Sequence, residues 1–315
     1  MIFSRASIVA ALFSLVTADK LNYTIVEPEY DTWGVINTGL KATMKPTTYK
    51  AELLEAGWVP ETCFNGPYLE GIEGKDIDVY SVTFGDCAEP FIVCRHKNTP
   101  ATPEMIFTGL ATLTGRMRQW VGNFVAIPEV KEGLAAWQSG PTIVVQNKYW
   151  ESPSLLIHEM AHAMDLIKLG SGSTGGTEYW TDQSVWRDRF LEDGHVPTSY
   201  ATTNYIEAFA EAAILKAYDL LVPGGLAQLP QNSDQLSNQL RMMNVIYSDF
   251  MLPRCNAKVP SSRMVSVPIS RRRRSNTRRA AAEPNVAVSH VPEIHVPEEL
   301  YNMEPHAEEA FDMGL

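Results

Sequence analysis

The sequence lacks several features that would place a protein in a familiar class. After the first eighteen residues no apolar stretch is long enough to cross a bilayer, and no Cys-x-x-Cys spacing or internal repeat occurs. These absences argue against a membrane span and against a zinc or redox site built from cysteines. Basic residues are in the minority, with 26 Lys and Arg against 37 Asp and Glu and a net charge of -11, which argues against a nucleic-acid partner.

The N-terminus has the pattern of a secretory signal. Residues 1–18, MIFSRASIVAALFSLVTA, combine one arginine, an apolar run from Ala6 to Val16 and small side chains before Asp19. This pattern predicts a signal peptide over 1–18 and a secreted, extracellular protein. The sequon at Asn22 predicts an N-linked glycan at the surface and fits the same compartment.

Four cysteines then predict two disulfides, because the secretory route is oxidising and the count is even. The cysteines are Cys63, Cys87, Cys94 and Cys255. Three pairings are possible. We favour Cys87 with Cys94, across FGDCAEPFIVC, and Cys63 with Cys255, which would tie the two ends of the body together.

Composition divides the mature chain into a body and a tail. Residues 19–255 have the length of one domain, and residues 19–75 are either part of it or an N-terminal extension or pro-segment. Residues 256–315 carry eight Lys and Arg between positions 258 and 279, then eight Asp and Glu between 283 and 312. Their scattered prolines, charge blocks and lack of period predict a disordered basic-then-acidic tail.

Within the body, the hydrophobic pattern predicts strands followed by helices. Strands are expected over residues 75–84, 91–96 and 141–149. Helices are expected over 104–121, from Pro153 through the two histidines below, from Asn204 to about 222 and over 236–250. The predicted fold class is α+β, with a small sheet and a mostly helical second half.

The stretch LLIHEMAHAMD carries the chemistry. On a helix, His158 and His162 project from one face and can present two imidazoles to one ion. Glu159 lies about a third of a turn away from His158, where it can accept a proton from a metal-bound water as general base. The spacing predicts one Zn²⁺ ion. The alternatives are chance, or two core histidines bonded to backbone groups.

A third protein ligand should come from downstream. The metzincin continuation needs Gly and His where this chain has Asp165 and Lys168, so that class is excluded. Asp182 is one candidate ligand. The stronger candidates are Glu207 and Glu211 in SYATTNYIEAFAEAAIL, four residues apart on one helical face, where one can bind the metal and the other can fix the tautomer of a ligating histidine.

Both glutamates also have ordinary structural explanations. Glu207 stands three residues after Asn204, so its side chain could complete a capping box rather than bind metal. Glu211 could pair with Lys216. His195 is either a loop residue or an alternative ligand, and residues 141–149 are either an interior strand or an edge strand that pairs with an extended substrate.

HEMAHAMD followed by SYATTNYIEAFAEA resembles the catalytic domain of the anthrax toxin lethal factor-type metallopeptidases, which are gluzincins. The resemblance covers about residues 140–222 and implies a zincin-like fold. It also implies that Glu207 is the third zinc ligand, that Glu211 supports the site and that Tyr200 donates to the oxyanion. The alternative for Tyr200 is an ordinary surface or core tyrosine.

Taken together, the motif and the resemblance predict a secreted zinc-dependent endopeptidase that acts on a protein or peptide substrate. The competing hypothesis comes from another class. It is a secreted structural or surface-binding protein that keeps the metallopeptidase fold and has no turnover.

Overall fold

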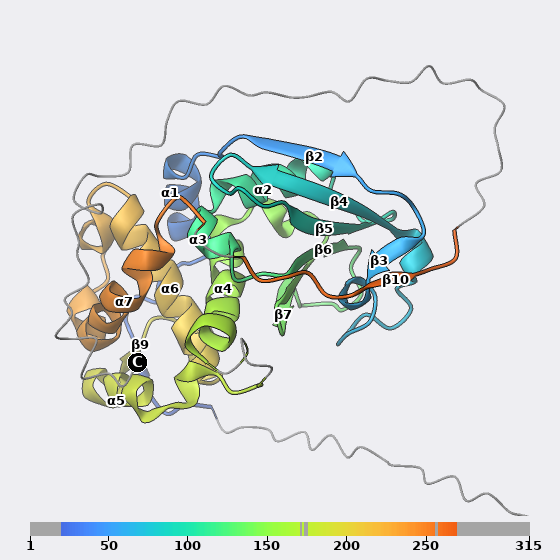
Figure 1. Cartoon of the computed structure of the whole chain (residues 1–315). Coiled ribbons are helices and arrows are strands. Elements are labelled where there is room, and N and C mark those ends of the chain that lie inside the picture. The colour runs from blue at the N-terminus through green and yellow to red at the C-terminus, as the bar shows by residue number, and fades with distance from the viewer. Residues whose placement is uncertain (1–19, 171, 173–175, 256–257, 270–315) are drawn as a thin grey trace, which may run out of the picture.

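A mixed six-stranded sheet forms one half of the molecule (Figure 1). The computed structural model describes residues 20–170, 172, 176–255 and 258–269. The predicted signal peptide at 1–18 lies outside the described residues. The strands of the main sheet are β2 (Tyr49–Leu53), β4 (Ile77–Phe84), β5 (Phe91–His96), β6 (Asn123–Ile127), β7 (Ala136–Ser139) and β8 (Thr142–Gln146).

The strand order is β2-β4-β5-β6-β8-β7, and only the β5–β6 and β6–β8 pairs are parallel. All residues of β6 and β8 are buried, as expected for parallel strands covered on both faces. Of the two alternatives for residues 141–149, the structure has the interior strand, which is β8. The edge strand beside it is β7, which the sequence pattern did not reveal.

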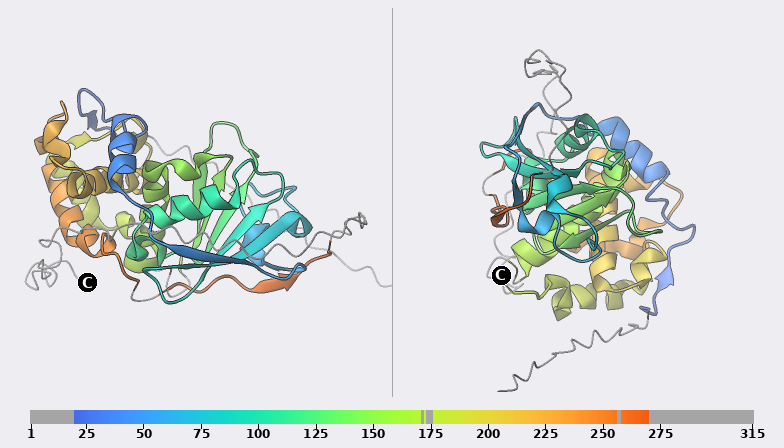
Figure 2. Two further views of the ribbon diagram at one scale, coloured as in Figure 1. Left: turned by 90° about the horizontal axis from the view of Figure 1, so that it is seen from above. Right: turned by 90° about the vertical axis from the view of Figure 1, so that its right-hand side faces the viewer.

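Helices form the other half and cover one face of the sheet (Figures 1 and 2). Two short strand pairs, β1 with β9 and β3 with β10, lie outside the main sheet. The helices and remaining strands are α1 (Val35–Thr43), α2 (Pro103–Thr112), α3 (Gly115–Arg118), α4 (Pro153–Ala163), α5 (Ser184–Asp193), α6 (Tyr205–Leu221), α7 (Ser237–Phe250), β1 (Thr24–Ile25), β3 (Trp58–Pro60), β9 (His195–Val196) and β10 (Met264–Ser266). The predicted mixture of helices and strands is confirmed at this level.

The helix expected over 104–121 is two helices, α2 and α3. Leu113 is extended, and the Thr114 side chain accepts the N–H of Met117 to start α3. A Cβ on Gly115 would collide with the carbonyl oxygen of Pro253. The break thus lets the C-terminal segment pass close against this turn, an approach that only glycine permits.

The cysteine pairing predicted from the sequence is wrong, although all four cysteines form disulfides. The bonds join Cys63 to Cys94 and Cys87 to Cys255. Successive residues of a strand face opposite sides of the sheet. Cys94 on β5 packs in the apolar cluster under the sheet with Cys63, whereas Cys87 packs in the main core on the helix side. The sheet therefore separates Cys87 from Cys94.

Both ends of the described chain belong to the domain. Within residues 19–75, β1 pairs with β9, α1 contacts α4 and α6, and β2 joins the main sheet, so this segment packs as part of the domain. The predicted tail begins at residue 256, yet Met264–Ser266 pairs with β3. The domain therefore continues to at least residue 266, and the rest of the predicted tail beyond Ile269 lies outside the described residues.

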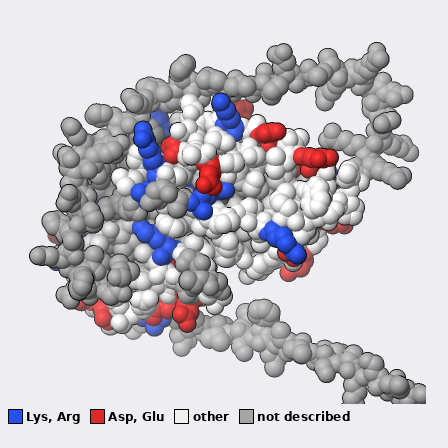
Figure 3. Space-filling model, in the orientation of Figure 1, with Lys and Arg blue, Asp and Glu red and all other residues white. Residues whose placement is uncertain are grey.

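The surface matches the acidic, mixed composition. In the view of Figure 3, Lys and Arg side chains are interspersed with Asp and Glu, and the described residues form no continuous patch of one sign on that face. Among the helices of the described part of the chain, none combines the length and apolarity needed to cross a membrane.

Candidate metal centre

Helix α4 carries the two histidines through the middle of the core. Its start follows the sequence signals, because the Ser152 hydroxyl accepts the N–H of Leu155 and Pro153 occupies the first turn. The Asn37 side chain on α1 accepts both the Ser152 hydroxyl and the N–H of Ser154, which fixes this end of the helix. All eleven residues of α4 are buried, as expected for a helix that is packed on all sides.

Helix α6 lies against α4 and carries the two glutamates. Its N-cap is Asn204, whose side chain accepts the N–H of Glu207 at 2.8 Å. The cap uses only the backbone of Glu207, so its carboxylate is free to reach the histidines. The buried alanines of this helix allow the two helices to approach closely; they are Ala208, Ala210, Ala212, Ala213 and Ala217.

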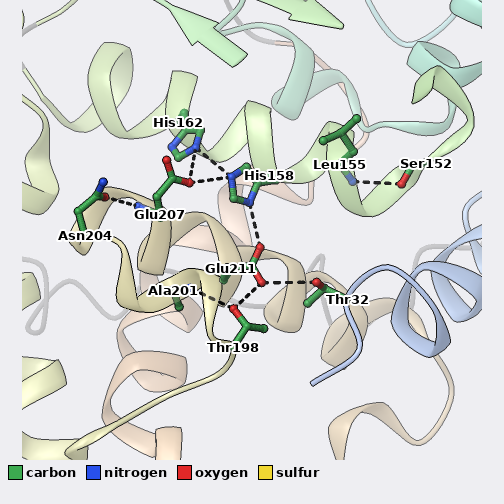
Figure 4. Close-up of polar contacts among 10 residues, drawn as sticks. All are labelled: Thr32, Ser152, Leu155, His158, His162, Thr198, Ala201, Asn204, Glu207 and Glu211. Carbon is green, nitrogen blue, oxygen red and sulfur yellow. Dashed lines mark hydrogen bonds and ion pairs between the residues drawn. The ribbon is translucent and has the colours of Figure 1, made fainter. Parts of the chain in front are cut away.

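Three side chains converge between the two helices (Figure 4). The Nε2 atom of His158 lies 3.0 Å from Oε2 of Glu207 and 3.1 Å from Nε2 of His162, and the His162–Glu207 distance is 3.3 Å. Their candidate ligand atoms all lie within 4.8 Å of one another. Two atoms bound tetrahedrally to one zinc ion at about 2.0–2.1 Å would be about 3.3–3.4 Å apart. The donor set therefore fits a small divalent ion after shifts of a few tenths of an ångström.

Glu211 holds His158 from the other side. Its Oε1 lies 3.2 Å from Nδ1 of His158, while its Oε2 accepts the hydroxyls of Thr198 at 2.9 Å and Thr32 at 3.5 Å. A carboxylate on Nδ1 favours the tautomer that leaves the Nε2 lone pair free for a metal. The alternative pairing of Glu211 with Lys216 does not occur, because Lys216 bonds to Asp219.

The charges of the cluster shift two of its pKa values in opposite directions. Burial lowers the pKa of His158, but the carboxylates of Glu207 and Glu211 outweigh burial and raise it to about 10. For Glu207, burial raises the pKa, and hydrogen bonds to the two imidazoles bring it well below its usual range. Without a metal, the His158 imidazole therefore carries a proton at neutral pH beside the ionised Glu207.

Glu159 and Tyr200 lie beside the cluster. Glu159 is 3% exposed, its Oε2 has no hydrogen-bond partner among the described residues, and burial raises its pKa. The Tyr200 ring centroid is 5.8 Å from that of His158, and the pKa of its phenol is raised, chiefly by burial and then by the charge of Glu207. Both residues line cavities of about 250 and 300 Å³ that also reach His158.

The other candidate ligands lie elsewhere. Asp182 is exposed and pairs with Arg187 at 3.1 Å. His195 lies on β9, where its two ring nitrogens contact the Asp193 carbonyl and the Gln235 side chain. The positions of Asp182 and His195 are therefore accounted for by these local partners.

Sequence reasoning missed two residues that position the site, Thr32 and Thr198, which orient Glu211. It also missed a buried carboxylate nearby. Asp165, just after the end of α4, is fully buried and accepts the N–H and hydroxyl of Thr181, and burial raises its pKa to about 6. The aspartate that ends HEMAHAMD was the one available signal for this carboxylate, because a charged residue next to a buried helix needs partners.

The fold and the cluster define a protein of mixed helices and sheets with a buried two-histidine, one-glutamate candidate metal site. Residues 32–249 match the model of a family described as conidiation-specific protein Con-13, and the chain belongs to that family. Conidiation-specific protein 13 of Neurospora crassa is 26% identical over 190 residues, which are 59% of this chain. The match spans about half of that relative, 53% of its length.

These matches correct the interpretation based on the motif. The chain is a Con-13 family member and not a lethal factor-type gluzincin, and neither matched description names a peptidase. The predictions of a zinc endopeptidase and of a hydrolase are therefore wrong. The resemblance came from two short helical segments, and such segments specify a metal-binding geometry without specifying turnover.

Proposed function

We propose that this protein is a secreted, non-catalytic binding protein that holds one zinc ion between α4 and α6. The observation that carries the proposal is the convergence of His158, His162 and Glu207 at 3.0–3.3 Å, with Glu211 behind His158. Imidazole nitrogens and a carboxylate are ligands that zinc accepts. When bound, the ion would supply a Lewis-acidic position that a donor group of a partner can occupy.

The predicted site residues keep structural roles within this proposal. His158, His162 and Glu207 bind the ion, and Glu211 orients His158. Glu159 and Tyr200 line the adjoining cavities rather than act in catalysis. The zincin-like arrangement of the fold is likewise a proposal, supported by the packing of α4 between α6 and the sheet. The name of the relative places that protein in conidiation, and we propose the same setting for this chain.

Zinc content and turnover test the proposal together. Protein secreted by its native host should contain about one equivalent of zinc by mass spectrometry of the metal, and should leave a peptide library uncut with or without a chelator. Glu159→Gln should keep the zinc, because none of the three converging ligand atoms belongs to Glu159. Cleavage by the wild type that is lost both on chelation and in Glu159→Gln would overturn the non-catalytic role.

Zinc affinity is expected to rise with pH. Because the carboxylates raise the pKa of His158, the imidazole holds a proton at neutral pH that the ion must displace. Displacement of one proton makes affinity increase about tenfold per pH unit between about pH 6 and 8. Calorimetry in buffers of different ionisation enthalpy measures the released proton directly. An affinity that is flat over this range would show that the ion does not bind the imidazoles.

A further inference from the structure

A third cavity lies on the outer side of the cluster and contains none of the three candidate ligands. It has a volume of about 400 Å³ and lies between the segment 29–33 and the segment 198–200. It shares Thr32, Trp33, Tyr200 and Glu211 with the cavity of about 250 Å³ that reaches Glu159. We call the outer cavity, with Glu29, Asp31, Trp33 and Tyr200 as its defining residues, the aromatic–acidic pocket.

Two exposed aromatic rings line this pocket. Trp33 is 55% exposed and Tyr200 is 50% exposed, so neither ring is buried in the core. Tryptophan and tyrosine are the aromatic residues most enriched where proteins bind partners. Their faces also attract cations within about 6 Å of the ring.

Two carboxylates of the pocket are held in place by hydrogen bonds. Glu29 accepts the backbone N–H of Ser199 at 2.5 Å and the Ser199 hydroxyl at 2.8 Å. Asp31 accepts the N–H groups of Gly34 at 2.7 Å and Val35 at 3.2 Å. Each carboxylate has lone pairs left for another donor. Because hydrogen bonds already order both carboxylates, a ligand that binds them avoids the entropy cost of ordering these side chains.

The pocket and its inner neighbour are negatively charged. Their described linings include Glu29, Asp31, Glu159 and Glu211 and contain no lysine or arginine. Two buried polar groups also lack a partner among the described residues, the hydroxyl of Tyr30 in the pocket lining and Oε2 of Glu159 in the inner cavity. Each of these two groups still needs a polar partner, which a bound ligand or an ordered water can supply.

We propose that the aromatic–acidic pocket binds a lysine or arginine side chain of a partner protein. The cationic head would lie between the two rings and the two carboxylates, and the methylene stem would cover Trp33. Such a long basic side chain combines an apolar stem with a charged head, which matches a pocket that combines rings and carboxylates. This inference deepens the proposed binding role, but it does not require the metal, since none of the three candidate ligands lines the pocket.

Fluorescence polarisation with the full chain tests this inference. The probe is a labelled peptide of alternating glycine and arginine, and the comparison peptide has glutamine in place of arginine. We expect binding of the arginine peptide only, with affinity falling as salt is raised. Trp33→Ala should weaken binding by about three- to thirtyfold, the range expected for a lost cation–π contact. Glu29→Gln should also weaken it, since the amide oxygen can still accept from Ser199 and only the charge is lost.

The chain offers matched controls. Trp58 is 53% exposed on β3, and Glu52 is exposed on β2, so Trp58→Ala and Glu52→Gln remove the same groups away from the pocket and should leave affinity unchanged. Equal binding by the wild type and Trp33→Ala, or equal binding of the glutamine peptide, would overturn the inference. So would cross-linking that places the chain's own Arg271–Arg274 run in the pocket, because the occupant would then be this chain.

The metal proposal can fail separately. Glu207→Ala should lose zinc and keep peptide binding, whereas Trp33→Ala should keep zinc and lose peptide binding. Loss of both properties in Trp33→Ala, with thermal unfolding unchanged, would show that the pocket and the metal site are one site and would overturn the inference as stated.

Discussion

Replacing Glu207 with alanine is expected to abolish stoichiometric zinc retention after dialysis. The substitution leaves the ion two histidines, and protein zinc sites use at least three protein ligands. Helix α6 should survive, because the Asn204 cap bonds to the backbone N–H of Glu207 and not to its side chain. Metal analysis after dialysis and circular dichroism together separate loss of the ligand from loss of the helix.

Glu211→Ala is the informative comparison for that experiment. Glu211 contacts His158 rather than the converging ligand atoms, so zinc affinity should fall only about 10- to 100-fold. Glu192→Ala removes a partly exposed glutamate of α5 that pairs with Arg189 and should change nothing. Zinc retained by Glu207→Ala but lost by Asp182→Ala would reassign the third ligand.

Removal of the Cys87–Cys255 disulfide is expected to give the largest loss of stability among the cysteine variants. This bond closes a loop of 168 residues, whereas Cys63–Cys94 closes 31. Chain-entropy estimates give about 5 kcal/mol for the longer loop and about 4 kcal/mol for the shorter. Denaturant unfolding of the two double-serine variants measures the order. Peptide mapping without reduction checks the pairing, and a peptide linking Cys87 to Cys94 would contradict it.

The helices of the site were predictable because local sequence signals mark where they begin. Ser152, Pro153 and Asn204 are capping signals, and they begin α4 and α6 where the structure has them. Helical spacing then places His158 beside His162 and Glu207 beside Glu211. The contact between α4 and α6 brings those two faces together, and the buried alanines of α6 allow the close approach.

Other features depend on contacts that no local pattern records. The cysteine pairing depends on which face of β5 Cys94 occupies, and the apolar segments on both sides of the sheet made the two faces indistinguishable. The edge strand β7 reads AWQS, with little β-propensity, and gains its structure from pairing with β8. The turn before α3 accommodates Pro253, whose carbonyl oxygen passes close to Gly115. Pro253 lies far along the chain from this turn.

The contact between Thr32 and Glu211 would couple occupancy of the proposed zinc site to the folding of the whole domain. These residues are 179 positions apart, and Asn37 and Ser152, which meet at the start of α4, are 115 apart. An unfolded chain cannot hold such distant groups together without a large loop-closure cost. A ligand that binds only the folded state stabilises it by about 2.7 kcal/mol at a free concentration one hundred times its Kd. Release of the ion should therefore coincide with global unfolding, so that a zinc indicator dye can report the fraction of molecules that remain native.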